Sequence, residues 1–330
     1  MDNYLNLCET INEILTKEKI TTLKKGFEKI SNKYRAETAD SSVIVTSDKE
    51  VLTYISSRMG ETAIIVDDVL KKVNSLCDID GTINKVLDLG SGTGSCLWAI
   101  ENYIENAKIV AVEREPQMIK YSKLLCKDLK HDIEYIQSDV LSPKVRNLSK
   151  FDLVIESFML NEIEEKERMR VVDVICEKSD DYIILVEPGT PKSYQNMMKI
   201  RQYILDNEFS LILPCPHSGE CGLVDDYCNF SVRVTRTKMS RQVKSGRLNY
   251  EDEKYYYLVF RKNASAQNTN NSIVIRRPVY RKGCVDLKLC NQDGSIKSKT
   301  LTKSDKENYK LAKELKHGDL CNFSKLKCND

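Results

Sequence analysis

The chain has 330 residues, of which 51 are Lys or Arg and 49 are Asp or Glu, so its formal net charge is only +2. This balance excludes a general affinity for polyanions, and any nucleic-acid contact must come from a local basic cluster. No stretch reaches the roughly 18–20 apolar residues of a membrane span, and the first residues resemble neither a signal peptide nor a transit peptide. We therefore expect no membrane partner, a cytoplasmic location, and twelve cysteines that are reduced or bind metal.

Residues 1–80 are predicted to form an N-terminal helical region. Apolar residues recur at helical spacing over 5–15 and 20–34, with many lysines on the opposite face. After a polar break, 49–67 and 69–76 are predicted to form two further helices.

Residues 81–212 are predicted to form a doubly wound α/β domain. An apolar run at 85–89 predicts a buried strand, a glycine-rich turn follows, and a helix begins at Ser95. Glycines permit positive φ, and the free N–H groups at the helix start can then face a ligand. The Gly-x-Gly-x-Gly spacing of Gly90, Gly92 and Gly94 differs from the Gly-x-Gly-x-x-Gly of dinucleotide-binding proteins.

This turn and the two strands after it resemble the cofactor-binding region of S-adenosylmethionine (SAM)-dependent methyltransferases. A carboxylate at Asp88 would repel a pyrophosphate but attract an ammonium or sulfonium group. Glu113 ends the next predicted strand, where a ribose-binding acid is expected, and Asp139 follows a third strand in the place of the family's adenine contact. The alternative is a glycine turn without a ligand. The resemblance implies a SAM site formed by Asp88, Gly90, Ser91, Gly92, Gly94, Glu113 and Asp139.

Two further strands are predicted at 151–156 and 182–187, followed by a helix over 193–206. The segment after the fourth strand does not contain the Asn/Asp-Pro-Pro-aromatic motif of methyltransferases that act on base amino groups. The polar candidates at these strand ends are Glu156, Asn161 and Glu187. None of them is an obvious general base, so the catalytic residues stay unassigned.

Residues 213–330 are predicted to form a cysteine-rich extension. Cys215, Cys221 and Cys228 lie within 14 residues of a loop rich in Pro and Gly, which something must hold in place. Thiolates select zinc or iron–sulfur clusters. Cys290, at an Asp-Gly turn after a predicted strand, is the more natural fourth ligand, and Cys284 is held in reserve.

Other uses of the cysteines stay open. His217 is near Cys215, but the single residue between them would strain a tetrahedral site. Cys215 also follows a proline, as does the nucleophile of RNA cytosine-C5 methyltransferases, although it comes after the fifth strand and not the fourth. Cys321 and Cys328 are expected to be free thiols in a polar tail, and core positions suit Cys8, Cys77, Cys96, Cys126 and Cys176.

A basic run separates the two cysteine segments. Residues 229–249 contain no acid, and their cations with nearby aromatics suit RNA phosphate contacts and base stacking. A second basic cluster follows a polar linker at 264–271 and precedes a predicted antiparallel hairpin. The predicted RNA-binding residues are Arg233, Arg236, Lys238, Arg241, Lys244, Arg276 and Arg277.

Together these motifs resemble the methyltransferase-like family that acts in assembly of the small ribosomal subunit and has mitochondrial and bacterial members. The resemblance runs from about residue 30 to 315 and rests most on Cys215-Pro-His217 and on the Tyr-Glu-Asp-Glu-Lys box at 250–254. It implies a SAM-type Rossmann domain, binding to small-subunit rRNA, and a [4Fe–4S] cluster on Cys215, Cys221, Cys228 and Cys290.

Two function classes follow from these motifs. The chain is either a SAM-binding, iron–sulfur-containing assembly factor, monomeric off the ribosome, or an active SAM-dependent rRNA methyltransferase. The missing catalytic motif favours the first class. A further alternative is a zinc-stapled RNA-binding protein without SAM function. A eukaryotic member would be mitochondrial, with its presequence removed.

Overall fold

The fold is taken from a computed structural model, which describes residues 2–35, 45, 47–77, 79–264 and 271–323. The chain forms two compact units, Met1–Glu187 with Val232–Glu253 and Pro188–Ser231 with Lys254–Asp330. This division differs from the boundaries expected at residues 80 and 212, because the chain enters the second unit at Pro188 and returns to the first at Val232. Within the described ranges, no helix is long and apolar enough to cross a membrane.

The first unit begins with the predicted helical region, made of α1 (Asp2–Leu15), α2 (Ile20–Arg35), α3 (Asp48–Tyr54), the π-helix η1 (Ile55–Met59) and α4 (Gly60–Cys77). The break expected near residue 68 is wrong, because α4 carries an unbroken buried stripe through Val66, Val69 and Val73. The irregular turn lies earlier, at η1. There the hydroxyls of Ser56 and Ser57 both donate to the carbonyl of Thr53, in competition with regular helical hydrogen bonds.

Five parallel strands form the sheet of the first unit, in the order β3-β2-β1-β4-β5. They are β1 (Lys85–Leu89), β2 (Lys108–Glu113), β3 (Asp132–Gln137), β4 (Phe151–Ser157) and β5 (Ser179–Pro188). Strand order reverses between β1 and β4, whose carboxyl ends meet where Leu89 pairs with Glu156. Open α/β sheets bind ligands at such a switch point. The five predicted strands and the predicted doubly wound, Rossmann-like α/β fold are confirmed.

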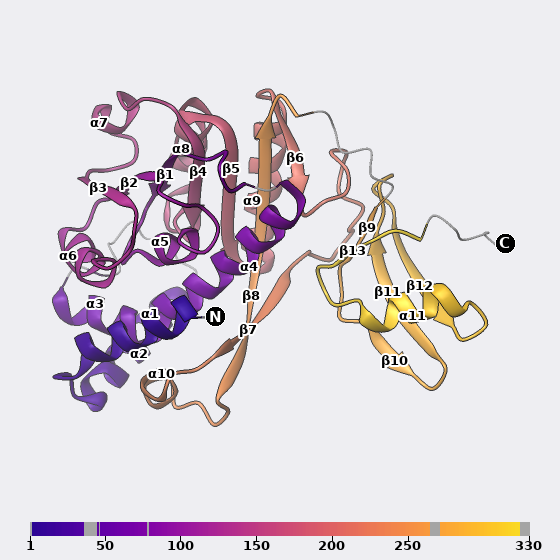
Figure 1. The fold of residues 1–330 in the computed structure, drawn as a ribbon, viewed down its shortest axis with the longest axis horizontal. Coiled ribbons are helices and arrows are strands. Elements are labelled where there is room, and N and C mark those ends of the chain that lie inside the picture. Colours follow the sequence, from indigo (N-terminus) through magenta and orange to yellow (C-terminus); the bar gives the residue numbers. More distant parts are fainter. Residues whose placement is uncertain (1, 36–44, 46, 78, 265–270, 324–330) are drawn as a thin grey trace. The chain divides into compact units, whose positions relative to one another are not determined.

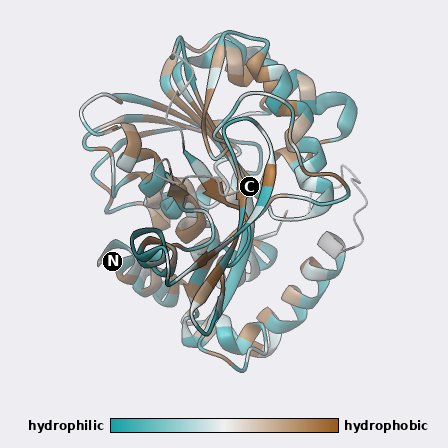
Figure 2. Cartoon of the chain, turned by 90° about the vertical axis from the view of Figure 1, so that its right-hand side faces the viewer, coloured by the Kyte–Doolittle hydropathy of each residue, from teal (hydrophilic) through white to brown (hydrophobic). Residues whose placement is uncertain are grey.

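Helices flank this sheet (Figure 1). They are α5 (Ser95–Ile100), α6 (Pro116–Leu125), α7 (Pro143–Arg146), α8 (Glu165–Lys178) and the short η2 (Leu160–Glu162). The central strands β1, β4 and β5 are buried on both faces, as expected of parallel strands covered by helices, whereas the edge strand β3 is partly exposed. Figure 2 colours the chain by hydropathy, with hydrophobic residues in brown. Leu87, Val154 and Ile184 are almost completely inaccessible to solvent.

A strand–helix–strand excursion follows, with β7 (Phe230–Thr235), α10 (Lys238–Val243) and the long β8 (Tyr250–Lys262). Strand β7 pairs with β8. The strand predicted at 255–261 is therefore longer than expected, and its first residues place the acids 251–253 opposite the basic run. The second unit also contains α9 (Pro191–Leu205), which confirms the predicted helix, and β6 (Phe209–Leu213), which pairs antiparallel with β8.

A small sheet completes the second unit, in the order β10-β11-β9-β13 with β12 beside β11. Its elements are β9 (Ser272–Val274), β10 (Val279–Arg281), β11 (Cys284–Cys290), β12 (Ile296–Thr302), α11 (Lys306–Glu314) and β13 (Leu320–Cys321). The predicted hairpin is confirmed by the antiparallel β11–β12 pairing. The polar-tail assignment of Cys321 is wrong, because its side chain is buried with Val274 and Leu289 in the core of this sheet. Cys328 lies outside the described residues.

Candidate functional site

The glycine turn after β1 is fastened to the end of β2. Gly90, Gly92 and Gly94 all have positive φ, at 72°, 52° and 90°. The N–H of Gly92 donates to Glu113 Oε2 at 2.9 Å, and Glu115 N donates to Glu113 Oε1 at 2.8 Å. The structure thus places the predicted glycine-rich turn against Glu113, the acid that was predicted to bind the ribose. Each carboxylate oxygen keeps a second lone pair, with which it could accept a ribose hydroxyl.

Glycine is required here by space as well as by backbone conformation. A Cβ at Gly94 would lie 2.6 Å from Cys126 Sγ and 2.7 Å from Ser122 Oγ. A Cβ at Gly90 would lie 2.7 Å from Met159 Sδ. Gly90 and Gly94 are therefore required by side chains that pack against the turn, whereas a Cβ at Gly92 would have its nearest neighbour at 3.9 Å.

Asp88 and Asp139 lie in opposite environments. The Asp88 carboxyl is 1% exposed, and neither of its oxygens has a hydrogen-bond partner among the described residues. Burial raises the pKa of Asp88 to about 8, which weakens the negative charge expected of this side chain near neutral pH. Asp139 is exposed after β3, and its Oδ1 accepts a hydrogen bond from Leu141 N at 2.8 Å.

The polar residues at the ends of β4 and β5 hold the chain in place. Glu156 Oε1 accepts from Met159 N at 2.7 Å and from Leu160 N at 3.0 Å, and Asn161 donates to Glu187. Both glutamates are at most 1% exposed, and burial raises the pKa of each, that of Glu156 to about 7. These carboxyls shape the turn over the glycine loop and are not presented to a substrate.

The four predicted ligand cysteines converge in the second unit. Cys215 follows β6, Cys221 and Cys228 lie in the loop before β7, and Cys290 ends β11. Every pair of these four thiols is close enough to interact electrostatically. Burial raises the pKa of Cys215, Cys228 and Cys290, the last to about 12, and the neighbouring thiols add to each shift. Cys284 lies at the opposite end of β11, opposite Thr302.

The cysteine loop is fixed to the β11–β12 hairpin by a close backbone approach. A Cβ at Gly222 would come within 3.0 Å of the carbonyl oxygen of Gly294, and a Cβ at Gly294 would lie 3.2 Å from the carbonyl oxygen of Glu220. Gly294 has φ 79°, a left-handed conformation that favours glycine. The approach brings Cys221 toward Cys290, which lies at the start of the same turn.

Asp226 holds the cysteine loop against the small sheet through two further contacts. Its Oδ1 accepts from Arg276 at 2.6 Å, and its Oδ2 accepts from Lys288 at 3.1 Å. Burial acts to raise the pKa of Asp226, but hydrogen bonds from Tyr227 N and from the two cations outweigh it and lower the pKa. Arg276, predicted to bind RNA, is thus engaged in positioning the cysteine loop.

Sequence reasoning missed the side chains that surround the four thiols. Tyr194 Oη donates to Cys221 Sγ at 3.0 Å. Arg201 is 3% exposed and donates to the carbonyl of His217 at 2.8 Å. The Nε2 of His217 lies 3.5 Å from Cys290 Sγ. Tyr194 and Arg201 are two turns apart on one face of α9, but nothing in the local sequence says that this face meets the cysteines.

Most of the predicted RNA-binding cations are already paired. Arg233 makes two bonds to Asp252, at 2.8 and 3.0 Å, and stacks on the Tyr250 ring at 4.1 Å. Arg236 binds Glu251 at 2.6 Å. These acids stand on β8, directly after the acid-free stretch. The remaining predicted cations are exposed, namely Lys238, Arg241 and Arg277.

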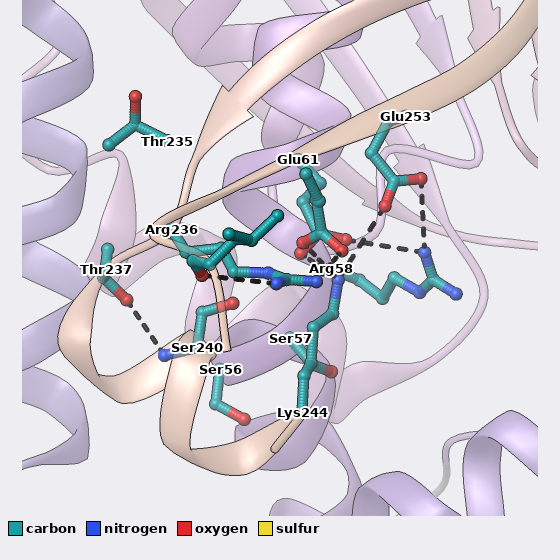
Figure 3. Close-up of polar contacts among 12 residues, drawn as sticks. Ser56, Ser57, Arg58, Glu61, Thr235, Arg236, Thr237, Ser240, Lys244 and Glu253 are labelled. Carbon is teal, nitrogen blue, oxygen red and sulfur yellow. Dashed lines mark hydrogen bonds and ion pairs between the residues drawn. The ribbon is translucent and has the colours of Figure 1, made fainter. Parts of the chain in front are cut away.

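Lys244 lies inside a buried ionic network, shown in Figure 3. Its side chain is only 7% exposed, binds Glu251 at 2.7 Å, and also contacts Glu61 of α4. Arg58 of η1 extends the network to Glu253 at 3.8 Å. Burial raises the pKa of Glu61 to about 8, against the attraction of Lys244. The carboxylates of this network approach one another as metal ligands could, but Lys244 supplies the positive charge.

Comparison with known proteins matches the chain to one family and to several of its curated relatives. The family model described as "Mitochondrial small ribosomal subunit Rsm22" matches residues 48–322. The human mitochondrial ribosome assembly protein METTL17 is 27% identical over 71% of this chain and 54% of its own length. An Rsm22-cox11 tandem protein of Schizosaccharomyces pombe is 25% identical over 94% of this chain and 49% of its own. The chain thus spans about half the length of these curated relatives.

Among solved structures, a magnesium protoporphyrin IX methyltransferase from Synechocystis PCC 6803 with bound SAM is 14% identical. The match covers 74% of this chain and 96% of that chain, with a TM-score of 0.41.

Proposed function

Because this chain belongs to the Rsm22 family of the mitochondrial small ribosomal subunit, we propose that it is an assembly factor that binds the rRNA of that subunit. In this account the first unit binds SAM and the second holds a [4Fe–4S] cluster. The convergence of four cysteines from two distant segments is the observation that carries the proposal. The human relative METTL17 is itself a mitochondrial ribosome assembly protein by name.

The spacing of the thiols supports a cluster over a single zinc ion. A tetrahedral zinc with bonds of ~2.3 Å would hold its sulfur atoms about 3.8 Å apart. In the part of the chain that the structure describes, no three ligand atoms of this site lie within 4.8 Å of one another. Cluster irons bind cysteines that are farther apart, and each of the four thiols nevertheless interacts with the other three. Cys215, Cys221, Cys228 and Cys290 would be the ligands.

The glycine turn supports SAM binding without identifying a methyl acceptor. Gly90, Gly92 and Gly94 would form the backbone cradle, and Glu113 would bind the ribose. Asp139 is free to turn toward an adenine amino group, since only one of its oxygens is engaged locally. The buried, turn-forming roles of Glu156 and Glu187 argue against either acting as a general base. The proposal therefore includes SAM binding and does not include methyl transfer.

Sedimentation with purified ribosomal subunits tests this function. The anaerobically purified chain should travel with small and not with large subunits. Cys221→Ser should lose iron and subunit binding together, whereas Cys284→Ser, a matched cysteine on the same strand as Cys290 but at its other end, should keep both. Equal binding to both subunits, or a Cys221→Ser protein that keeps its iron, would contradict the proposal.

A further inference from the structure

Arg201 is a buried cation without a conventional partner. It is 3% exposed, and it donates a hydrogen bond to a backbone carbonyl, that of His217. Its Nε has no hydrogen-bond partner among the described residues, and within the same residues it forms no ion pair. A buried charge is strongly unfavourable unless it is compensated, so a negative group is expected beside this guanidinium.

The groups that face Arg201 are the thiols of the cysteine site. Its positive charge acts on Cys215 and on Cys290, which come from different segments of the second unit. Since Arg201 has no ion pair with an acidic side chain in the described part of the chain, the compensating charge must come from the thiolates and from whatever they bind. Tyr194, seven residues earlier on α9, donates to a third thiol, Cys221, at 3.0 Å.

We propose that Arg201 is the counter-charge of the four-cysteine site and that Tyr194 is its hydrogen-bond donor, so that these two side chains of α9 set the reduction potential of the cluster. This inference rests on the proposed [4Fe–4S] cluster. Reduction adds one electron to the irons and one unit of negative charge to the site, and it breaks no bond. A fixed positive charge and a donated hydrogen bond both favour the more negative state, and therefore raise the potential. Arg201 and Tyr194 are positioning residues, not ligands.

The test measures iron content and midpoint potential by dye-mediated titration with dithionite as the electron donor, on the full chain purified without oxygen. Arg201→Met removes the charge but keeps most of the length. We expect its reduction constant to fall at least tenfold, which is a potential about 59 mV lower for a one-electron couple. Tyr194→Phe should lower the potential by a smaller amount. Arg201→Lys should stay close to the unaltered protein.

Lys199→Met is the matched control, because it removes one positive charge from an exposed position on the same helix. Its potential should not change. An Arg201→Met protein with full iron and an unchanged potential would overturn the inference and leave the cluster intact. If Arg201→Met fails to hold iron, Arg201→Lys decides: restored iron supports the counter-charge, and lost iron refutes it. An unaltered protein without iron would instead refute the proposed cluster itself.

Discussion

Gly222→Ala tests whether the close approach of the cysteine loop to the β11–β12 turn builds the metal site. The added Cβ would come within 3.0 Å of the carbonyl oxygen of Gly294. Carbon–oxygen contacts normally begin near ~3.3 Å, so the two backbones must separate by more than about 0.3 Å. Metal sites tolerate displacements of only about 0.2 Å. We therefore expect the Cys290 thiol to move away from the Cys221 thiol, so that the two can no longer bind the same cluster.

The predicted magnitude has two parts. Overpacking of this kind destabilises a protein by about 1–3 kcal/mol, and the iron content of Gly222→Ala should fall below that of the unaltered chain after the same reconstitution. Gly219→Ala is the matched control, because its Cβ would meet its nearest neighbour, His217 Nδ1, at an ordinary 3.7 Å. Thermal unfolding and iron analysis of both variants measure the effect. If Gly222→Ala keeps its iron and has the same melting temperature as Gly219→Ala, the reasoning is refuted.

Further predictions concern the basic excursion. Lys244→Met should destabilise the first unit by about 1–3 kcal/mol, because it removes the cation that both the half-buried Glu251 and the buried Glu61 contact. The exposed control Lys238→Met should stay within about 0.5 kcal/mol in the same denaturant titration. Glu61 has a pKa raised from 4.5 to about 8, so its contribution to stability is complete below about pH 4.5 and is lost as the pH rises through about 8. The melting temperature of Glu61→Gln should therefore depend less on pH between about 4.5 and 8 than that of the unaltered protein. An unchanged dependence would contradict the raised pKa of Glu61. Lys238→Ala with Arg241→Ala should weaken rRNA binding and reduce its salt slope by about 2; a slope equal to that of the unaltered protein would remove these two contacts.

The first sheet was predictable because its signals are local. Each strand is a short apolar run, and the three glycines of the turn, Gly90, Gly92 and Gly94, indicate a backbone with positive φ. The chain order of these runs then fixes a doubly wound sheet, since right-handed crossovers leave few alternatives. The break in the N-terminal helices was misplaced, because it depends on serine hydroxyls bonding to Thr53 and not on an interruption of the apolar stripe.

The convergence of the four cysteines was predictable from the sequence, but the side chains that surround them were not. Cys290 could be chosen over Cys284 because an Asp-Gly turn follows it. The roles of Arg201 and Tyr194 depend on which face of α9 meets the loop, and a helical pattern does not give that information.

The basic run shows the same limit. Arg236 and Lys244 suit an RNA surface when 229–249 is read alone. Their acidic partners lie on a strand that pairs back on the run and on a helix that is 183 residues from Lys244 in sequence. Local composition therefore shows that the segment is positively charged, but it does not show that acidic side chains elsewhere in the chain neutralise this charge.

The most direct test of the central claim is an iron and sulfide determination, with an absorbance spectrum, on the chain purified without oxygen. We predict about four irons and four sulfides per chain and a broad thiolate-to-iron band, as expected for a cluster bound by four cysteines. One zinc per chain and a colourless protein would contradict the account.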